Sequence, residues 1–157
     1  MDQAIINAPF GQLRLIADDG YLTGIDFLLE KQPLKKPATP LLREAEAQLV
    51  AYFRNPEHPF DLPLRLEGTA FQRRVWQALE EIPPGAPLTY GQLAKKLNTA
   101  PRAIGGACGA NPIPVIVPCH RVVSASGIGG FMKTRYLGSL NIKSWLLAHE
   151  RAHEQSE

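Results

Sequence analysis

Residues 89–110 read TYGQLAKKLNTAPRAIGGACGA, and this stretch decides the fold expected for the second half of the chain. Thr89 is followed three residues later by Gln92, which is the pattern of a capping box at a helix N-terminus. The apolar positions that would face inward are Leu93, Ala94 and Leu97. The stretch therefore predicts a short helix that begins directly after Thr89.

A second short helix is expected after a break at Asn98. Thr99 can cap this helix, and Pro101 falls in its first turn, where proline is tolerated. Two short helices joined by a tight turn form a helix-turn-helix, which occurs in DNA-binding proteins. Ordinary helical cores contain similar helix pairs, so this pattern alone leaves both interpretations open.

The second helix is unusually rich in glycine, with Gly105, Gly106 and Gly109. Each glycine costs about 1 kcal/mol relative to alanine in a helix, so their number needs a reason. One reason is close packing against another helix. The other is access to DNA, because a helix is about 10–12 Å across and the minor groove only about 6 Å wide. Arg102 at the start of this helix could then enter the base stack in place of an extruded nucleotide, or bind phosphate.

An apolar segment, Ile113 to Val117, leads into Pro118-Cys119-His120-Arg121. A thiol beside an imidazole suits nucleophilic catalysis, because a cysteine with a pKa of about 8.5 needs a base at neutral pH. Adjacent side chains of a strand point to opposite faces, so contact between Cys119 and His120 requires a turn at Cys119 or a bridging water. A buried structural thiol beside an incidental histidine is the alternative.

Glu150 is expected at the end of the last helix, whose predicted apolar face consists of Ile142, Trp145, Leu146 and Leu147. A carboxylate at a helix C-terminus opposes the helix dipole, which suggests another role for it. Orienting His120 would complete a Cys-His-Glu triad. The alternative is a solvated glutamate at the start of a polar tail, residues 151–157.

A second capping-box pattern, Thr69 with Gln72, predicts a helix that Pro83-Pro84-Gly85 ends. Its apolar face would consist of Phe71, Val75, Ala78, Leu79 and Ile82. Together with the helix pair, this helix predicts a mainly helical domain over residues 67–150.

Residues 1–66 predict a small α/β domain. Leu13 to Ala17 and Tyr21 to Leu28 flank an Asp-Gly turn and are expected to pair as antiparallel strands. Thr39 and Pro40 begin a helix that ends at Asn55 and buries Leu42, Ala45, Leu49 and Tyr52 or Phe53. Alternating apolar residues then predict one more half-buried strand over 60–66.

Composition is that of an ordinary globular protein of 157 residues with a net charge of +2. Residues 1–66 carry seven basic and nine acidic residues, a charge of −2, whereas residues 67–157 carry ten and six, a charge of +4. A nucleic-acid surface would therefore belong to the second half. No apolar run is long enough to span a membrane, and Met1-Asp2-Gln3 does not begin a secretory signal, so a cytoplasmic protein is expected. The two cysteines, Cys108 and Cys119, do not form a zinc-binding pattern.

Several motifs together resemble the O6-alkylguanine-DNA alkyltransferases, the methylated-DNA-protein-cysteine methyltransferase family. They are Tyr90, Arg102-Ala103-Ile104-Gly105-Gly106, Asn111-Pro112, Pro118-Cys119-His120-Arg121-Val122 and Trp145-Leu-Leu-Ala-His-Glu150. The resemblance is close over residues 71–150, whereas residues 1–66 match only in length and in their expected pattern of strands and a helix. It implies a ribonuclease H-like α/β domain followed by a domain with a winged helix-turn-helix-like motif.

The resemblance also implies an activity and a set of roles. The protein would transfer an alkyl group irreversibly, once per molecule, from O6-alkylguanine or O4-alkylthymine in DNA to Cys119, without a metal or cofactor. His120 would deprotonate Cys119 through a water, Glu150 would orient His120, and Asn111 would brace the turn before them. The residues implied at the DNA are Tyr90 for nucleotide rotation, Arg102 as the finger that fills the vacated stack, and Ala103, Gly106 and Arg121. The residues implied around the flipped base are Tyr90, Val123, Tyr136 and Ser139.

The expected partner is double-stranded DNA that carries O6-alkylguanine, bound through the minor groove by a monomer that could act cooperatively on DNA. Two other functions remain open from the residues alone. A damage sensor or helix-turn-helix regulator would use Cys119 only structurally, and a cysteine hydrolase would turn over repeatedly.

Overall fold

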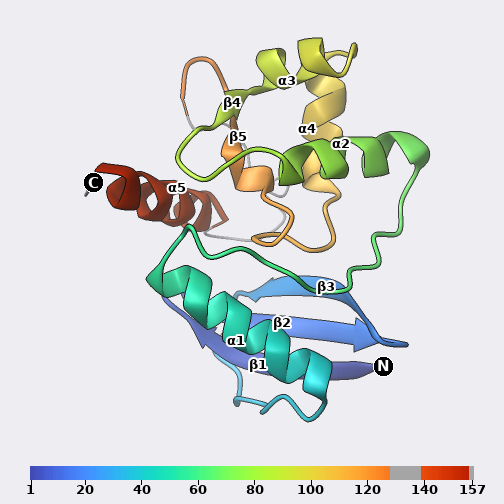
Figure 1. The fold of residues 1–157 in the computed structure, drawn as a ribbon, viewed down its shortest axis with the longest axis vertical. Coiled ribbons are helices and arrows are strands. Elements are labelled where there is room, and N and C mark those ends of the chain that lie inside the picture. The colour runs from blue at the N-terminus through green and yellow to red at the C-terminus, as the bar shows by residue number, and fades with distance from the viewer. Residues whose placement is uncertain (128–138, 156–157) are drawn as a thin grey trace. The chain divides into compact units, whose positions relative to one another are not determined.

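The computed structural model describes residues 1–127 and 139–155 (Figure 1). The chain divides into two compact units, Met1–Leu66 and Glu67–Glu157. Among the described residues, no helix is both long enough and apolar enough to cross a lipid bilayer.

The first unit contains a three-stranded antiparallel sheet in the order β1-β2-β3. The strands are β1 (Asp2–Ala8), β2 (Gly11–Asp18) and β3 (Tyr21–Leu28). Asp19 and Gly20 form the turn between β2 and β3 with φ of 51° and 82°. Aspartate and glycine are among the residues that tolerate positive φ, and the expected hairpin is confirmed.

Helix α1 (Pro40–Arg54) covers one face of this sheet (Figure 1). The Thr39 side chain accepts a hydrogen bond from the Leu42 amide, and Asn55 ends the helix. Leu42, Ala45, Leu49 and Tyr52 are buried with the inward side chains of the strands. The predicted helix and its caps are therefore confirmed.

The strand expected over residues 60–66 is wrong in part. This segment makes one isolated parallel bridge, in which Leu22 donates to the Pro63 carbonyl at 2.8 Å and accepts from the Arg65 amide at 3.0 Å. Pro59 and Pro63 have no N–H group and cannot donate to a strand ladder. The segment therefore lies beside the sheet without joining it as a regular strand.

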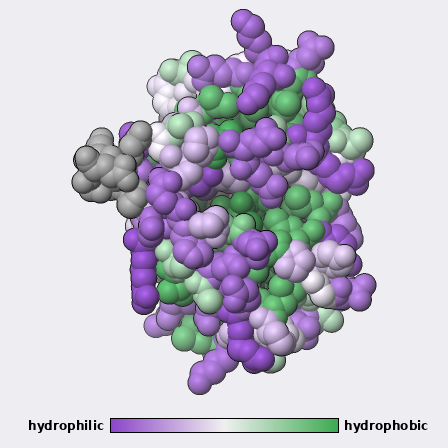
Figure 2. Space-filling model, in the orientation of Figure 1, coloured by the Kyte–Doolittle hydropathy of each residue, from purple (hydrophilic) through white to green (hydrophobic). Residues whose placement is uncertain are grey.

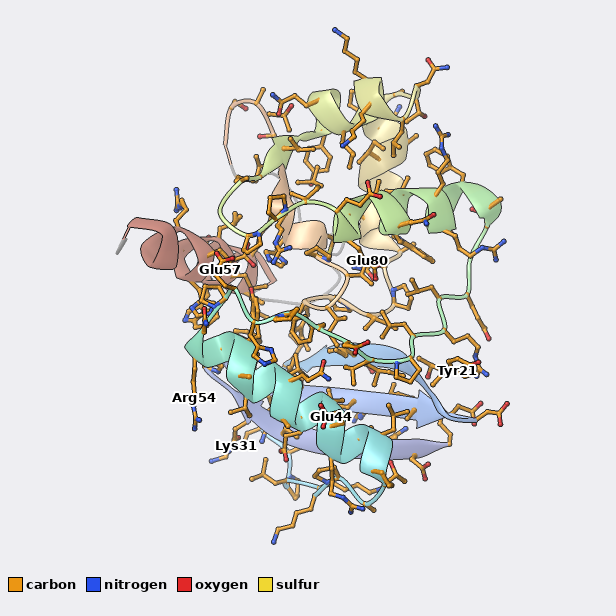
Figure 3. The ribbon with its side chains drawn as sticks, viewed as in Figure 1. Tyr21, Lys31, Glu44, Arg54, Glu57 and Glu80 are labelled. Carbon is orange, nitrogen blue, oxygen red and sulfur yellow. The ribbon has the colours of Figure 1, made fainter. Side chains whose placement is uncertain are left out.

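Two buried glutamines hold the loops of this unit to its core. The side-chain Nε2 of Gln12 donates to the backbone carbonyl of Gln32 at 2.9 Å, and its Oε1 accepts from the backbone N–H of Gln32 at 2.8 Å. Gln48 of α1 forms the same pair of bonds with Asp61 and also donates to Glu44, which Figure 3 labels on α1. Each glutamine side chain thus bonds the backbone N–H and the backbone carbonyl of one loop residue.

The second unit is mainly helical. Its helices are α2 (Ala70–Glu80), α3 (Tyr90–Lys96), α4 (Pro101–Gly109) and α5 (Ser139–Gln155). Both capping boxes are present, at Thr69 with Gln72 and at Thr89 with Gln92, as expected. α4 packs on both α2 and α3, and hydrophilic side chains project at the end of the unit that carries α3 (Figure 2).

A short parallel pair joins the start of α3 to the centre of the unit. β4 (Leu88–Thr89) pairs with β5 (Val122–Val123), which follows the 3-10 turn η1 (Cys119–Arg121). This pairing places Val122 and Val123, each 34 positions from its partner in the sequence, next to the beginning of α3.

The N-cap of α4 is Ala100, so the expectation that Thr99 caps this helix is wrong. Asn98 has a φ of 55°, and this left-handed turn directs the Thr99 amide to the Ala94 carbonyl at 2.8 Å. The chain needs one more extended residue before Pro101 begins the helix. Ala100 offers no side-chain hydrogen bond, and α4 begins without one.

Helix α5 continues to Gln155, which corrects two expectations. Glu150 does not lie at the helix end, so the argument from the helix dipole does not apply, and residues 151–155 are helical. The predicted apolar face is also displaced, because the buried positions among residues 141–151 are Lys143, Leu146 and Glu150. These positions are three and four residues apart and form one face of the helix.

Candidate active site

A short loop between α4 and η1 is held by the side chain of Asn111, which is fully buried. Its amide nitrogen donates to the Val117 carbonyl at 2.8 Å, and its oxygen accepts from the Ile113 amide at 3.0 Å. Within this loop Val115 has a φ of 75°, a conformation that a β-branched residue rarely adopts. Asn111 therefore fixes a strained loop directly before the thiol.

Cys119 begins the η1 turn after Pro118, and this turn answers the geometric question raised by the sequence. The backbone at Cys119 is not an extended strand, so adjacent side chains need not point to opposite faces. Cys119 is 2% exposed and His120 is fully buried. Within the described residues no hydrogen bond joins them, and Nδ1 of His120 has no partner there.

His120 and Glu150 form a buried pair. Nε2 of His120 lies 2.9 Å from Oε2 of Glu150, and the carboxylate is 1% exposed. Burial by itself would raise the pKa of Glu150, but hydrogen bonds from His120 and Arg121, together with the positive charge of Arg121, hold it at about 2. Glu150 is therefore a carboxylate across the physiological pH range.

Arg121 is also buried and binds the same carboxylate. Its Nε donates to Oε1 of Glu150 at 3.0 Å, and its Nη2 donates to Oε2 at 2.9 Å. Nη1 donates to the Ile82 carbonyl, just beyond the end of α2, at 2.6 Å. These contacts leave the guanidinium inside the unit, so the expectation that Arg121 binds DNA does not fit its surroundings.

The resting site is electrically neutral at Cys119 and His120. Burial raises the pKa of Cys119 to about 11, although the Asn111 hydrogen bond and the charge of Lys143 lower it. Burial lowers the pKa of His120, against the opposing effect of Glu150. At pH 7 the sulfur therefore keeps its proton, and the imidazole is neutral and can accept a proton.

Lys143 of α5 is fully buried next to this site, and sequence reasoning missed it. Its ammonium donates to the Val122 carbonyl at 2.8 Å and lies 3.5 Å from the Tyr90 hydroxyl. Burial lowers the pKa of Lys143 to about 8, and burial followed by the two cysteines raises that of Tyr90 to about 12. The helical spacing could have predicted its burial, since Lys143 lies on one face of α5 with Leu146 and Glu150.

The surface of α4 is open where its central glycines lie. A Cβ atom added at Gly105 or Gly106 would meet no heavy atom of the described residues within 4 Å. Close helix packing therefore does not explain these two glycines, and Arg102 is exposed one turn before them. On the opposite face, the Trp76 indole donates to the Ala107 carbonyl at 2.8 Å and anchors α4 to α2. Ala103 and Gly106 are half-buried on this helix.

Only two of the four expected pocket residues are placed. Tyr90 and Val123 are half-buried at the start of α3 and in β5. Tyr136 lies outside the described residues, as does the side chain of Ser139, the first residue of α5. Val123 also lines an open cavity of about 350 Å³ with Ser144 and Leu147 of α5. The described residues contain no group of three or more side chains that could hold a metal ion.

Known protein families match both units. Residues 1–66 match the ribonuclease-like domain of 6-O-methylguanine DNA methyltransferase, and residues 70–152 match its DNA-binding domain. A methylated-DNA–protein-cysteine methyltransferase of Methanosarcina acetivorans is 41% identical, over 96% of this chain and 98% of that protein. A protein of the same name from Mycobacterium tuberculosis is 40% identical, over 97% and 93%.

Solved structures agree with this match over nearly the whole chain. The O6-methylguanine methyltransferase of M. tuberculosis has a TM-score of 0.81 at 39% identity, covering 96% of this chain and 93% of that one. The M. tuberculosis protein in complex with DNA has a TM-score of 0.78 at 39% identity, covering 95% and 92%. The two-domain fold expected from the sequence is confirmed, and the chain belongs to the 6-O-methylguanine DNA methyltransferase family.

Proposed function

We propose that this protein repairs DNA by transferring an alkyl group from O6 of guanine to Cys119, once per molecule. The relatives with 40–41% identity carry the name of this activity, and one structural neighbour was solved with DNA. The observation that carries the proposal is a buried thiol in a tight turn next to a histidine that a carboxylate orients. O4-alkylthymine is a second substrate of the same chemistry.

The reaction forms a carbon–sulfur bond and breaks the bond between the alkyl carbon and O6. The electron pair of the broken bond remains on the guanine, which takes up a proton and is restored. The thiol proton leaves toward Nδ1 of His120 through a water, because Nδ1 is buried and has no other partner among the described residues. The thioether on Cys119 has no leaving group, so each molecule reacts once.

DNA binds at the face of α4 that carries Arg102. The small side chains of this helix let it approach a groove too narrow for a helix with long side chains. Arg102 occupies the stack that the damaged nucleotide leaves when it rotates out of the duplex, and Tyr90 contacts that nucleotide. The protein binds double-stranded DNA as a monomer, and a reactive thiol of this kind suits a reducing compartment such as the cytoplasm.

Mass spectrometry after incubation with a duplex that contains O6-methylguanine tests the proposal. We expect a gain of one methylene group per chain, which stops at one equivalent. Trypsin leaves Cys108 and Cys119 in one peptide, residues 103–121, so the modified sulfur must be located by fragmentation. The Cys108→Ser variant is the matched control and should gain the same mass. An unchanged mass would support a damage-binding protein, and repeated turnover a hydrolase.

A further inference from the structure

Arg121 is the one side chain of the catalytic turn that alkyl transfer leaves without a role. It is 9% exposed, and all three of its guanidinium nitrogens donate to acceptors inside the unit. We propose that Arg121 is a positioning residue that acts through Glu150 to keep His120 neutral, with its proton on Nε2 and a free lone pair on Nδ1. This inference rests on the proposed function only in naming Nδ1 as the base.

The geometry of the Glu150 carboxylate determines its charge. Arg121 binds both oxygens of Glu150 side by side, at 3.0 and 2.9 Å, and His120 shares Oε2. Such a paired contact with a permanently charged guanidinium keeps a carboxylate ionised. An ionised carboxylate can only accept hydrogen bonds, so the bond at 2.9 Å requires a proton on Nε2 of His120.

The tautomer follows from that bond. A neutral imidazole carries one proton, and if Nε2 holds it then Nδ1 is the acceptor. Nδ1 is buried and has no hydrogen-bond partner among the described residues. The nitrogen free to take the thiol proton is therefore selected at Glu150, on the other side of the ring.

The balance of buried charges disfavours a second proton on His120. Arg121 and Glu150 together carry no net charge, so a proton on His120 would add one net positive charge to an interior that already holds Lys143, where charge is costly. The charged groups that act on His120 are Glu150 and Lys143 of α5 and Arg121 of its own turn. Burial lowers the pKa of His120 first, Glu150 raises it, and Arg121 and Lys143 lower it.

Without Arg121, the Glu150 carboxylate would lose the guanidinium that binds both of its oxygens, while its contact with His120 would remain. The pair would then favour the imidazolium, which cannot accept a proton from Cys119. Arg121→Met removes the cation and keeps much of the side-chain length. Arg121→Lys keeps a cation, and Arg121→Met with Glu150→Gln removes both charges, so that the net charge around His120 is again that of the parent protein.

The first measurement is nitrogen NMR of the free protein with labelled histidine, which requires no substrate. The chain has four histidines, and the H120Q variant identifies the signal of His120. In the parent protein we expect a neutral ring with a proton on Nε2 at pH 7. In R121M the pH at which half of the His120 rings are protonated, the titration midpoint, should rise by about one unit or more. R121K and the double variant should keep it low.

The second measurement is the rate of alkyl transfer as a function of pH. In R121M the pH at which this rate falls on the acid side should rise by the same amount as the titration midpoint from NMR. The control is Arg14→Met, which removes a cation that faces Asp26 at 3.7 Å in the sheet of the first unit. It should shift neither curve. If R121M does not fold, R121K and the double variant still decide the question.

An unshifted His120 midpoint in R121M would overturn the proposal and leave Arg121 as a structural clamp between Glu150 and Ile82. So would a proton on Nδ1 in the parent protein. A loss of DNA affinity with an unchanged midpoint would favour a phosphate contact instead. If the parent protein gained no mass on damaged DNA, the proposed function would fail while the NMR result stood.

Discussion

The helix pair α3–α4 and the turn η1 with α5 place their charges in opposite environments. On α3 and α4 the charged side chains, Lys95, Lys96 and Arg102, are exposed. Around η1 and α5 the ionisable side chains are buried, and they are Cys119, His120, Arg121, Lys143 and Glu150. One region therefore carries its charge at the surface, and the other holds its ionisable groups in contact with one another in the interior.

The difference teaches that the two regions can be changed separately. An exposed charge interacts mainly with solvent or a ligand, so its removal alters binding more than folding. A buried charge depends on its neighbours, and its removal leaves them without a partner. Variants in the two regions should therefore fail in different assays.

The largest effect is expected for Cys119→Ala, which should abolish alkyl transfer and leave DNA binding intact. The variant removes the nucleophile and creates only a small cavity, while α4 and Arg102 are untouched. Transfer to an O6-methylguanine duplex and binding to that duplex are measured on the same sample. Methyl transfer by this variant would contradict the division between the two regions, as would loss of binding.

His120→Gln should slow alkyl transfer by about 10²- to 10⁴-fold at pH 7, because a general base is lost. The pKa of His120 is lowered by burial, so the parent protein should keep its rate at pH 7 and lose it only when the pH falls below the usual range of histidine. In the variant only free thiolate reacts, and its rate should rise about tenfold per pH unit toward the Cys119 pKa of about 11. Parallel pH profiles for the two proteins would rule out His120 as the base.

Arg102→Ala should reduce transfer from duplex DNA by about tenfold or more and leave transfer from the free alkylated base nearly unchanged. Rotating a nucleotide out of the stack costs a few kcal/mol, which Arg102 would partly offset. Rates on the two substrates give the ratio directly. Equal losses on both would place the effect of Arg102 in the chemistry rather than at the DNA.

The smallest effect is expected for Gly106→Ala, which should raise the free energy of unfolding by about 0.5–1 kcal/mol. The added methyl group enters open space among the described residues. Gly68→Ala is the matched control and should destabilise, because its Cβ would lie 2.6 Å from the Trp76 ring. Urea unfolding measures both. A destabilised Gly106→Ala variant would mean that α4 packs more closely than its surface indicates.

Features that depend on neighbouring residues were predictable from the sequence. Both capping boxes and the Asp19-Gly20 turn lie within four residues of chain, and each formed where its residues predict it. The cap of α4 was misplaced by one residue, because the conformation of Asn98 decides where α3 ends. The proline of the 60–66 segment, Pro63, prevented a strand that the apolar alternation favoured.

Features that depend on distant pairing were not predictable in the same way. Arg121 and Glu150 are 29 residues apart, and the sequence alone does not say whether an arginine after a histidine faces DNA or a buried carboxylate. Lys143 is a second example, because a lysine on a helix is ordinarily exposed. A Cys-His-Glu triad was expected from the sequence, but only the fold gives the 2.9 Å contact between His120 and Glu150.

The burial of Cys119 also bears on how long the protein remains competent after its synthesis. A thiolate is the form that peroxides and stray electrophiles attack, and exposure sets how often they reach it. At 2% exposure and with a pKa of about 11, this sulfur is nearly inert until a lesion enters the site. For a protein that reacts once, such chemical dormancy preserves the stock of unreacted molecules in the cell.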